Sequence, residues 1–218
     1  MRVSRVKTED MSLNGAADES SIRMQDGLLP RVKEFKYLGA TIQEDGEYGR
    51  EVKMRVKAGW NRWRKMSGIM CDRRVSARLK GKVYSTAIRP AMLYSMETVP
   101  LTKKQETECE VAELRMLRFA MGVTRMDKIR NEHIRGTAGV ERMSKKLGKT
   151  RLRWYGHVLR REEGYIGKKI MAIEPPGTRR RGRPKRRFID ALKENMKVVG
   201  VRKEDAKNRK GWRAKIKE

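Results

Sequence analysis

The sequence predicts a mainly α-helical protein with a small β-rich segment at its N-terminus. From Arg50 onwards, apolar residues recur every three or four positions, which is the period of an amphipathic helix. Thr102 and Gln105 have the spacing of a capping box at a helix start. Residues 1–48 instead place short apolar groups between Asn-Gly, Asp-Gly and single-Gly turns, which is typical of short strands.

The first expected helix begins at Arg50 and has an apolar face and several basic faces. The pattern favours core packing for Trp60 and Trp63, with base stacking as the alternative. Three cations near its end, Arg62, Arg64 and Lys65, are candidate phosphate contacts. The apolar positions of this helix are Val52, Val56, Trp60, Trp63, Met66 and Met70.

A second helix is expected after Ser76 as N-cap, with Leu79, Val83 and Ala87 facing inward. Pro90 disfavours helical geometry at the residue before it, so a break or kink is expected there.

The third helix is expected to start at Thr102 and to end before Gly122. Glutamates lie early in this segment and arginines late, which matches the helix dipole. Its core face is predicted to contain Val111, Leu114, Leu117 and Met121.

Further along, two short helices are expected around Gly139, at residues 129–136 and 140–147, and another from Trp154 to Arg160. Pro175, Pro176 and Gly177 then interrupt regular structure. Two last helices are expected, one ending at Gly200 and one defined by Ala206, Trp212 and Ile216.

The net charge of +28 is unevenly distributed. Residues 1–50 carry a net charge of −1, whereas residues 151–218 carry +15. Such an excess favours a polyanionic partner, with RNA or DNA ahead of an anionic membrane surface.

Two cysteines cannot form a disulfide framework, which is typical of a reducing compartment. No apolar run approaches the about 20 residues that span a bilayer, and no secretory signal is visible. An intracellular protein of the nucleus or cytoplasm, without a membrane partner, is expected.

Arginines and aromatic rings are concentrated between residues 151 and 187, and nucleic acid is the partner that best fits this combination. The sequence RLRWYGHVLRR is followed by the run RRRGRPKRR. The candidate contacts in this stretch are Arg151, Arg153, Arg160, Arg161, Arg179, Arg180, Arg181, Arg183, Lys185, Arg186 and Arg187.

Several segments resemble the C-terminal part of reverse transcriptases from non-LTR (LINE-type) retrotransposons, particularly the group with an apurinic-type endonuclease. Their order and spacing, rather than any single segment, make the resemblance specific. The segments are KTEDM (7–11), FKYLGATI (35–42), the run at 67–94, the run at 113–135, RLRWYGHVLRR (151–161) and RGRPKRR (181–187).

The resemblance implies an organisation in which the chain holds the end of a polymerase palm and the helices that follow it. The implied parts are a palm remnant (1–48), a helical thumb (49–122), a basic helical domain (123–173), a Pro/Gly/Arg-rich arm (174–187) and terminal helices (188–218). The motif residues carried over are Lys7, Phe35, Tyr37, Gly39, Trp154 and His157.

Catalytic residues and cofactors are not expected in this chain. The family's polymerase centre uses Tyr or Phe followed by Ala-Asp-Asp to hold two metal ions, and the sequence contains no Ala-Asp-Asp. The resemblance therefore implies a nucleic-acid-binding fragment without polymerase activity. The alternative is part of an active polymerase whose catalytic half is encoded upstream.

Other readings of single motifs remain open. Arg181-Gly182-Arg183-Pro184 is the core of an AT-hook-like element, so a chromatin-associated minor-groove binder is an alternative. Cys71, Cys109, His133 and His157 lack the close pairs of a zinc site, so no metal site is predicted. His157 is predicted to be structural, because no nucleophile is near it in the sequence.

Overall fold

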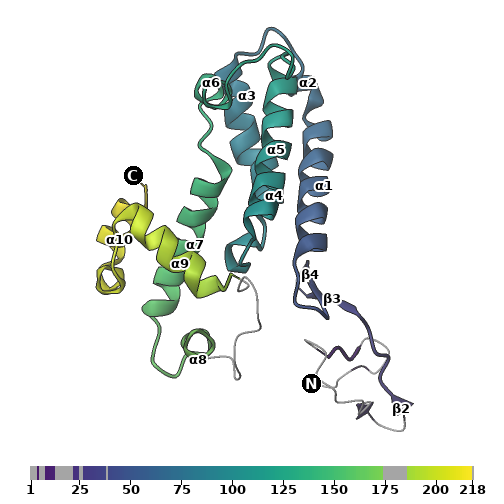
Figure 1. The fold of residues 1–218 in the computed structure, drawn as a ribbon, viewed down its shortest axis with the longest axis vertical. Coiled ribbons are helices and arrows are strands. Elements are labelled where there is room, and N and C mark those ends of the chain that lie inside the picture. The colour runs from purple at the N-terminus through teal and green to yellow at the C-terminus, as the bar shows by residue number, and fades with distance from the viewer. Residues whose placement is uncertain are drawn as a thin grey trace. The chain divides into compact units, whose positions relative to one another are not determined.

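The computed structural model describes residues 4, 8–12, 22–24, 27–37, 39–173 and 186–217 (Figure 1). The chain divides into two compact units, residues 1–57 and 58–218. The protein is mainly helical, with two small sheets near the N-terminus, which confirms the predicted fold class.

Two antiparallel hairpins make up the strands of the first unit. β1 (Arg23–Met24) pairs with β2 (Gly27–Leu28), and β3 (Glu34–Tyr37) pairs with β4 (Ala40–Gln43). Phe35 is opposite Ile42 in the second hairpin. Gly39 in its turn has φ +82°, a left-handed conformation that favours glycine.

Within the first unit, a buried carboxylate fixes the β3–β4 hairpin to the start of helix α1 (Gly49–Lys65). Glu51 is 2% exposed and accepts a hydrogen bond from the backbone N–H of Thr41 at 2.8 Å. Arg55 donates both to this carboxylate and to the carbonyl oxygen of Gly39. The β3–β4 hairpin is therefore held by polar contacts within this unit.

Helices make up most of the second unit, and their caps follow the sequence signals. The Ser76 hydroxyl accepts from the N–H of Leu79, and Thr102 and Gln105 form the predicted capping box. The elements are α2 (Ser67–Met70), α3 (Ala77–Val83), the π-helical turn η2 (Tyr84–Ile88), α4 (Arg89–Leu93), the 3-10 turn η3 (Met96–Thr98), α5 (Lys103–Ala120), α6 (Asn131–Ala138), α7 (Met143–Leu159), α8 (Ile166–Ala172), α9 (Phe188–Val199), the 3-10 turn η4 (Lys203–Lys207) and α10 (Arg209–Lys217).

Pro90 does not end the second predicted helix. The N–H of Arg89 bonds to the carbonyl of Tyr84, five residues earlier, so a π turn leads directly from α3 into α4. Pro90, which has no N–H to donate, follows this π turn directly in the first turn of α4.

The inward face of α3 is also displaced by one residue from the predicted one. Leu79 is 49% exposed, whereas Lys80 and Gly81 are buried. The ammonium group of Lys80 donates to the carbonyl oxygen of Ala120 at 2.6 Å. Gly81 lies so close to α6 that an added Cβ would be 1.8 Å from the Ala138 oxygen, which explains why α3 turns this face toward α6.

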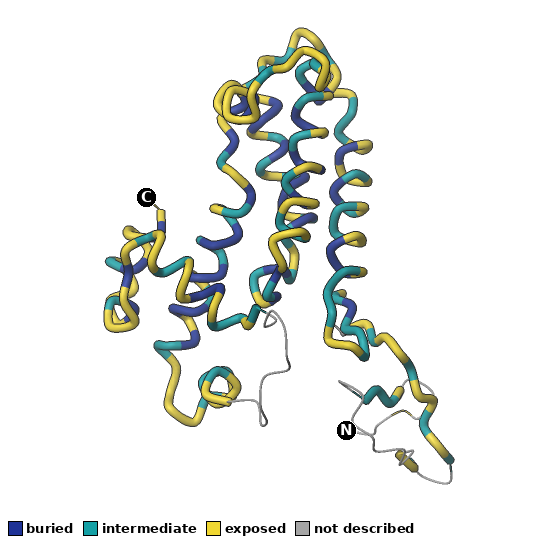
Figure 2. The backbone as a smooth tube through the Cα atoms, in the orientation of Figure 1, coloured by how far each residue is buried: buried dark blue, intermediate teal, exposed yellow. Residues whose placement is uncertain are grey.

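Helix α5 carries a charged residue at the centre of its buried face. Buried and exposed residues alternate along the helices of the second unit (Figure 2). The predicted core residue Val111 is 43% exposed, whereas Glu113 is fully buried. Leu117 is buried as predicted. The buried face of α5 is therefore rotated from the predicted one so that it includes Glu113, because this carboxylate has partners inside the fold.

The Glu113 network consists of Glu113, Tyr84, Arg89 and Arg135. One carboxylate oxygen accepts from Arg89 at 2.6 Å and from the Tyr84 hydroxyl at 3.1 Å, and the other accepts from Arg135 at 3.2 Å. Burial, followed by the Glu113 charge, raises the pKa of Tyr84 well above its usual value, so its hydroxyl remains a donor. Arg89 also donates to the carbonyl oxygen of Glu141 at 2.5 Å, which connects the network to the start of α7.

Helix α7 is one continuous helix, where a break had been expected between residues 147 and 154. It packs against α9 and α10 (Figure 1). The indole N–H of Trp212 donates to the carbonyl of Leu152 at 3.1 Å, and Gly156 makes room for the ring. This C-terminal cluster contains Leu152, Tyr155, Leu192, Val201, Ala206, Trp212 and Ile216.

Replacing Glu113 with Gln should destabilise the protein strongly. The change removes the counter-charge of Arg89 and leaves Arg135 with only its 3.8 Å contact to Glu110, and breaking a buried ion pair costs roughly 3–5 kcal/mol. Urea unfolding monitored by circular dichroism measures this loss. The exposed Glu108→Gln on the same helix is the control, and equal stability of the two variants would contradict the assigned role of the Glu113 network.

Replacing Gly156 with Ala should loosen the contact between α7 and α10. The added Cβ would lie 2.3 Å from the Trp212 indole nitrogen, and overpacking of this kind costs roughly 1–3 kcal/mol. Gly136→Ala in α6 is the control, because no atom lies within 4 Å of its added Cβ. Thermal unfolding should show a lower Tm for the first variant only, and an unchanged Tm for Gly156→Ala would refute the packing.

Candidate nucleic-acid interface

The exposed side of α7 and the nearby face of α10 enclose a basic pocket of about 320 Å³. All its lining residues belong to the second unit. We call this cavity the α7–α10 pocket; it is lined by Glu97, Thr150, Arg153, Trp154, His157, Arg160, Arg209, Trp212 and Arg213.

Helical spacing explains why the basic residues meet at this pocket. Arg153, His157 and Arg160 are four and three residues apart and share one side of α7. The neighbouring positions Leu152 and Tyr155 are buried in the C-terminal cluster, so the basic side is directed away from it.

Helix α10 contributes the remaining arginines by the same rule. Arg209 and Arg213 are four residues apart and exposed, whereas Trp212 and Ile216 are buried against α7. Docking of the apolar side of α10 therefore places its two arginines beside those of α7.

The positive charge of this pocket is not neutralised within the described part of the chain. Among the described residues, no carboxylate forms an ion pair with Arg153, Arg209 or Arg213. Arg160 donates to the carbonyl oxygen of Ala206 at 3.0 Å. Burial, followed by repulsion from Arg209 and Arg213, lowers the pKa of Arg160, as expected for cations gathered without counter-charges.

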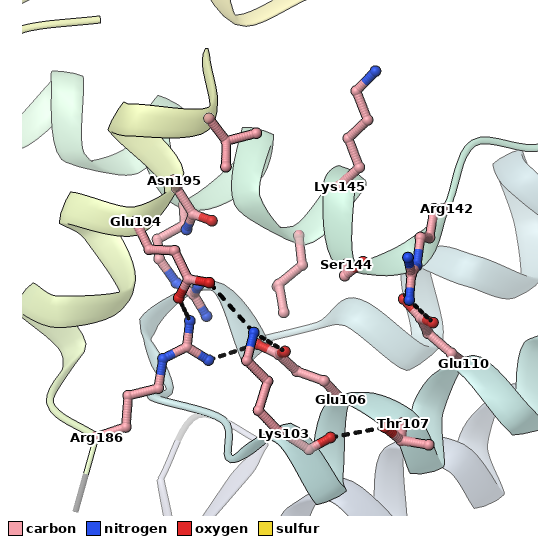
Figure 3. Close-up of a pocket in the computed structure, with 13 residues that line it drawn as sticks. Lys103, Glu106, Thr107, Glu110, Arg142, Ser144, Lys145, Arg186, Glu194 and Asn195 are labelled. Atoms are coloured by element: carbon pink, nitrogen blue, oxygen red, sulfur yellow. Dashed lines mark hydrogen bonds and ion pairs between the residues drawn. The ribbon is translucent and has the colours of Figure 1, made fainter. Parts of the chain in front are cut away.

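A second cavity, of about 380 Å³, lies between α5, α7 and α9 and differs in its charge balance (Figure 3). Lys103 and Arg186 both contact Glu106 and Glu194, as the dashed lines in Figure 3 show. These cations are already paired, which leaves them less available to an external anion.

Arg142 makes the other ion pair at the edge of this second cavity. Its guanidinium donates two hydrogen bonds to Glu110, at 2.8 and 2.9 Å. Burial raises the pKa of Glu110, but bonds from Arg142 and Ser144 outweigh it and hold the pKa below its usual value. The second cavity is therefore internally neutralised and is the weaker anion site.

The structure corrects two of the predicted phosphate contacts. Arg151 is 2% exposed and donates to the carbonyl oxygens of Glu97 at 3.2 Å and Val99 at 3.0 Å. Burial, with repulsion from Arg186, lowers its pKa to about 10. Arg186 donates to the Leu101 carbonyl and to two carboxylates. Both arginines fix chain segments to one another instead of facing solvent.

The other predicted contacts that the structure describes are exposed or half-buried. Arg161 donates to His157 Nε2 at 3.2 Å and lies over the ring of Tyr165. Arg187 is exposed directly before α9. Arg62, Arg64 and Lys65 are exposed on α1 and do not line the α7–α10 pocket.

Several predicted residues lie outside the described part of the chain: Lys7, Arg179, Arg180, Arg181, Arg183 and Lys185. Phe35, Tyr37 and Gly39 belong to the β3–β4 hairpin and its turn. Trp154 is half-buried and packs edge-on against Phe188, with ring centroids 5.5 Å apart. His157 is exposed at the pocket and accepts a hydrogen bond from Arg161, so it is satisfied, as the sequence predicted, without being packed in the core.

Sequence reasoning missed Arg209 and Arg213. The sequence does contain a pattern that indicates them. Arg209 and Arg213 are four residues apart, as are Trp212 and Ile216, and this spacing predicts a helix with one basic and one apolar face.

Within the described residues, no cluster of three or more His, Cys, Asp or Glu side chains could hold a metal ion. None of the described helices combines the length and apolar character needed to cross a bilayer.

Comparison with known proteins gives one informative similarity. The chain is 25% identical over 204 residues to an uncharacterized transposon-derived protein of Caenorhabditis elegans. The alignment covers 87% of this chain and 72% of the nematode protein. No protein-family profile matches the chain, and no solved structure matches it. The similarity is consistent with an origin in a transposable element.

The two cysteines should differ in reactivity. Cys109 is buried, and burial followed by the nearby Glu108 and Glu106 raises the pKa of its thiol to about 12. Cys71 is exposed. Native protein treated with iodoacetamide should be alkylated at Cys71 alone, and at both cysteines in urea. Equally rapid labelling of Cys109 in native protein would contradict its placement in α5.

Proposed function

We propose that this chain is the nucleic-acid-binding part of a retrotransposon reverse transcriptase, where it holds template, primer or target by phosphate contacts. The observation that carries the proposal is the α7–α10 pocket, where Arg153, Arg209 and Arg213 converge without an ion-pair partner among the described residues. Similarity to a transposon-derived protein supports the origin that this function requires.

Arginine is suited to this task because its planar guanidinium can form two parallel hydrogen bonds to a phosphate. Phosphate contacts position a nucleic acid without reading its sequence, so the proposed binding is largely independent of sequence. Trp154 adds an aromatic surface beside these cations, a combination found in single-strand binding sites.

The proposed role is binding without nucleotidyl transfer. Two-metal phosphoryl transfer requires closely placed carboxylates, and the only carboxylate lining the α7–α10 pocket within the described residues is Glu97. Primer extension by this polypeptide with magnesium would overturn this part of the proposal.

Binding should be strongly salt-dependent, and the pocket arginines should account for part of that dependence. Each phosphate neutralised on duplex DNA contributes roughly −0.9 to the slope of log K against log salt. Arg153→Ala with Arg213→Ala should therefore reduce the magnitude of the slope by about 2. Fluorescence anisotropy titrations at several salt concentrations measure it.

The control for this titration is Lys197→Ala, an exposed cation of α9 that does not line the α7–α10 pocket. Its slope should match that of the wild type. An absence of binding to both RNA and DNA at low salt would sink the proposed function, as would an unchanged slope in the arginine variant.

A further inference from the structure

We propose that the α7–α10 pocket receives the phosphorylated end of a single nucleic-acid strand, with the terminal phosphomonoester held among Arg160, Arg209 and Arg213. This inference rests on the proposed function and specifies the ligand of the same site. The ligand chemistry is a phosphomonoester, carried by either a 5′ or a 3′ strand end.

The size of the pocket favours a strand end over a duplex. At about 320 Å³ it lies near the lower limit of roughly 300 Å³ for small-molecule sites. Such a cavity accepts a group no larger than a nucleotide, whereas a duplex presents its phosphates along a broad surface. A continuous duplex would contact only the rim.

The charge of the pocket favours a monoester over a diester. A phosphodiester carries one negative charge, whereas a phosphomonoester carries about −1.5 to −2 at neutral pH. Arg160, Arg209 and Arg213 are close enough for the last two to lower the pKa of the first. A dianion would relieve this repulsion more completely than a diester.

The polar groups available at the wall fit an incoming anion. Arg209 and Arg213 have no ion-pair partner among the described residues, so their donors can bind the phosphate oxygens without breaking an internal contact. His157 lies on the same side of α7 and lines the same cavity. Glu97 is the one lining carboxylate among the described residues, and its charge opposes anion binding next to it.

The aromatic lining of the pocket offers a contact for the nucleoside that carries the phosphate. Trp212 is 1% exposed and its indole N–H is committed to Leu152, so it supports the pocket from within the core. Trp154 is half-buried and also lines the pocket. A base or sugar next to the terminal phosphate would contact the accessible part of the Trp154 ring.

The test compares short single-stranded oligothymidylates bearing a 5′-phosphate, a 3′-phosphate or no terminal phosphate, titrated against the full chain at fixed ionic strength. At least one phosphorylated end should bind about tenfold more tightly than the unphosphorylated strand, the gain expected of one charge-assisted contact. The arm that shows the gain identifies the strand end. The gain should shrink below about pH 6, where the monoester loses its second charge.

A double variant, Arg209→Ala with Arg213→Ala, should lose the tighter binding of the phosphorylated strand. Both side chains line the pocket and lack ion-pair partners among the described residues. Lys210→Ala, an exposed cation of the same helix outside the pocket lining, should retain it. Thermal unfolding of each variant verifies that α10 remains folded.

Three results overturn the inference, and they are distinguishable. Equal affinity for all three strands, with binding still salt-dependent, would refute the strand-end site and leave the proposed function standing. Failure to bind any of the three strands at low salt would refute both. A gain that survives in the double arginine variant would also refute this site.

Discussion

The buried carboxylate of Glu113 constrains most of the helical unit. Its two oxygens accept hydrogen bonds from Arg89, Arg135 and Tyr84, which belong to different helical segments. A lone carboxylate at this depth would be costly, so α5 can be buried on this face only with both arginines in place. Arg89 also binds the Glu141 carbonyl, so the same network fixes the start of α7.

Helix α7 links this network to the proposed binding surface. Helix α7 has glycines on its buried side: Gly148 faces the side chain of Asn195, and Gly156 lies so close to the Trp212 ring that a larger residue would clash with it. The close approach of α10 brings Arg209 and Arg213 beside Arg160. The shape of the pocket therefore depends on helix packing at a glycine, and its charge depends on the arginines.

Helix positions were predictable from sequence because periodicity and capping are local properties. Ser76, the Thr102–Gln105 box and Gly200 mark helix ends where the structure has them. Pro90 was predicted to break or kink the second helix; the helical segment continues through it, but a π turn at Tyr84–Ile88 interrupts the regular α pattern just before it.

The inward faces of α3 and α5 could not be predicted in the same way. A sequence pattern assigns charged residues to solvent, whereas Glu113 and Arg151 are buried by partners distant in the chain. Arg151 was expected to meet phosphate and instead binds the carbonyl oxygens of Glu97 and Val99. The grouping of Arg160 with Arg209 and Arg213 likewise exists only after α10 docks.

Photo-crosslinking of a nucleic-acid strand, followed by mass spectrometry of the linked peptides, tests the central claim most directly. A strand carrying 4-thiothymidine next to its terminal phosphate should link to the peptides of α7 and α10 that contain Trp154, His157 and Arg213. Links confined to other helices, such as α1 with Arg62 and Arg64, would contradict the placement of the interface at the α7–α10 pocket.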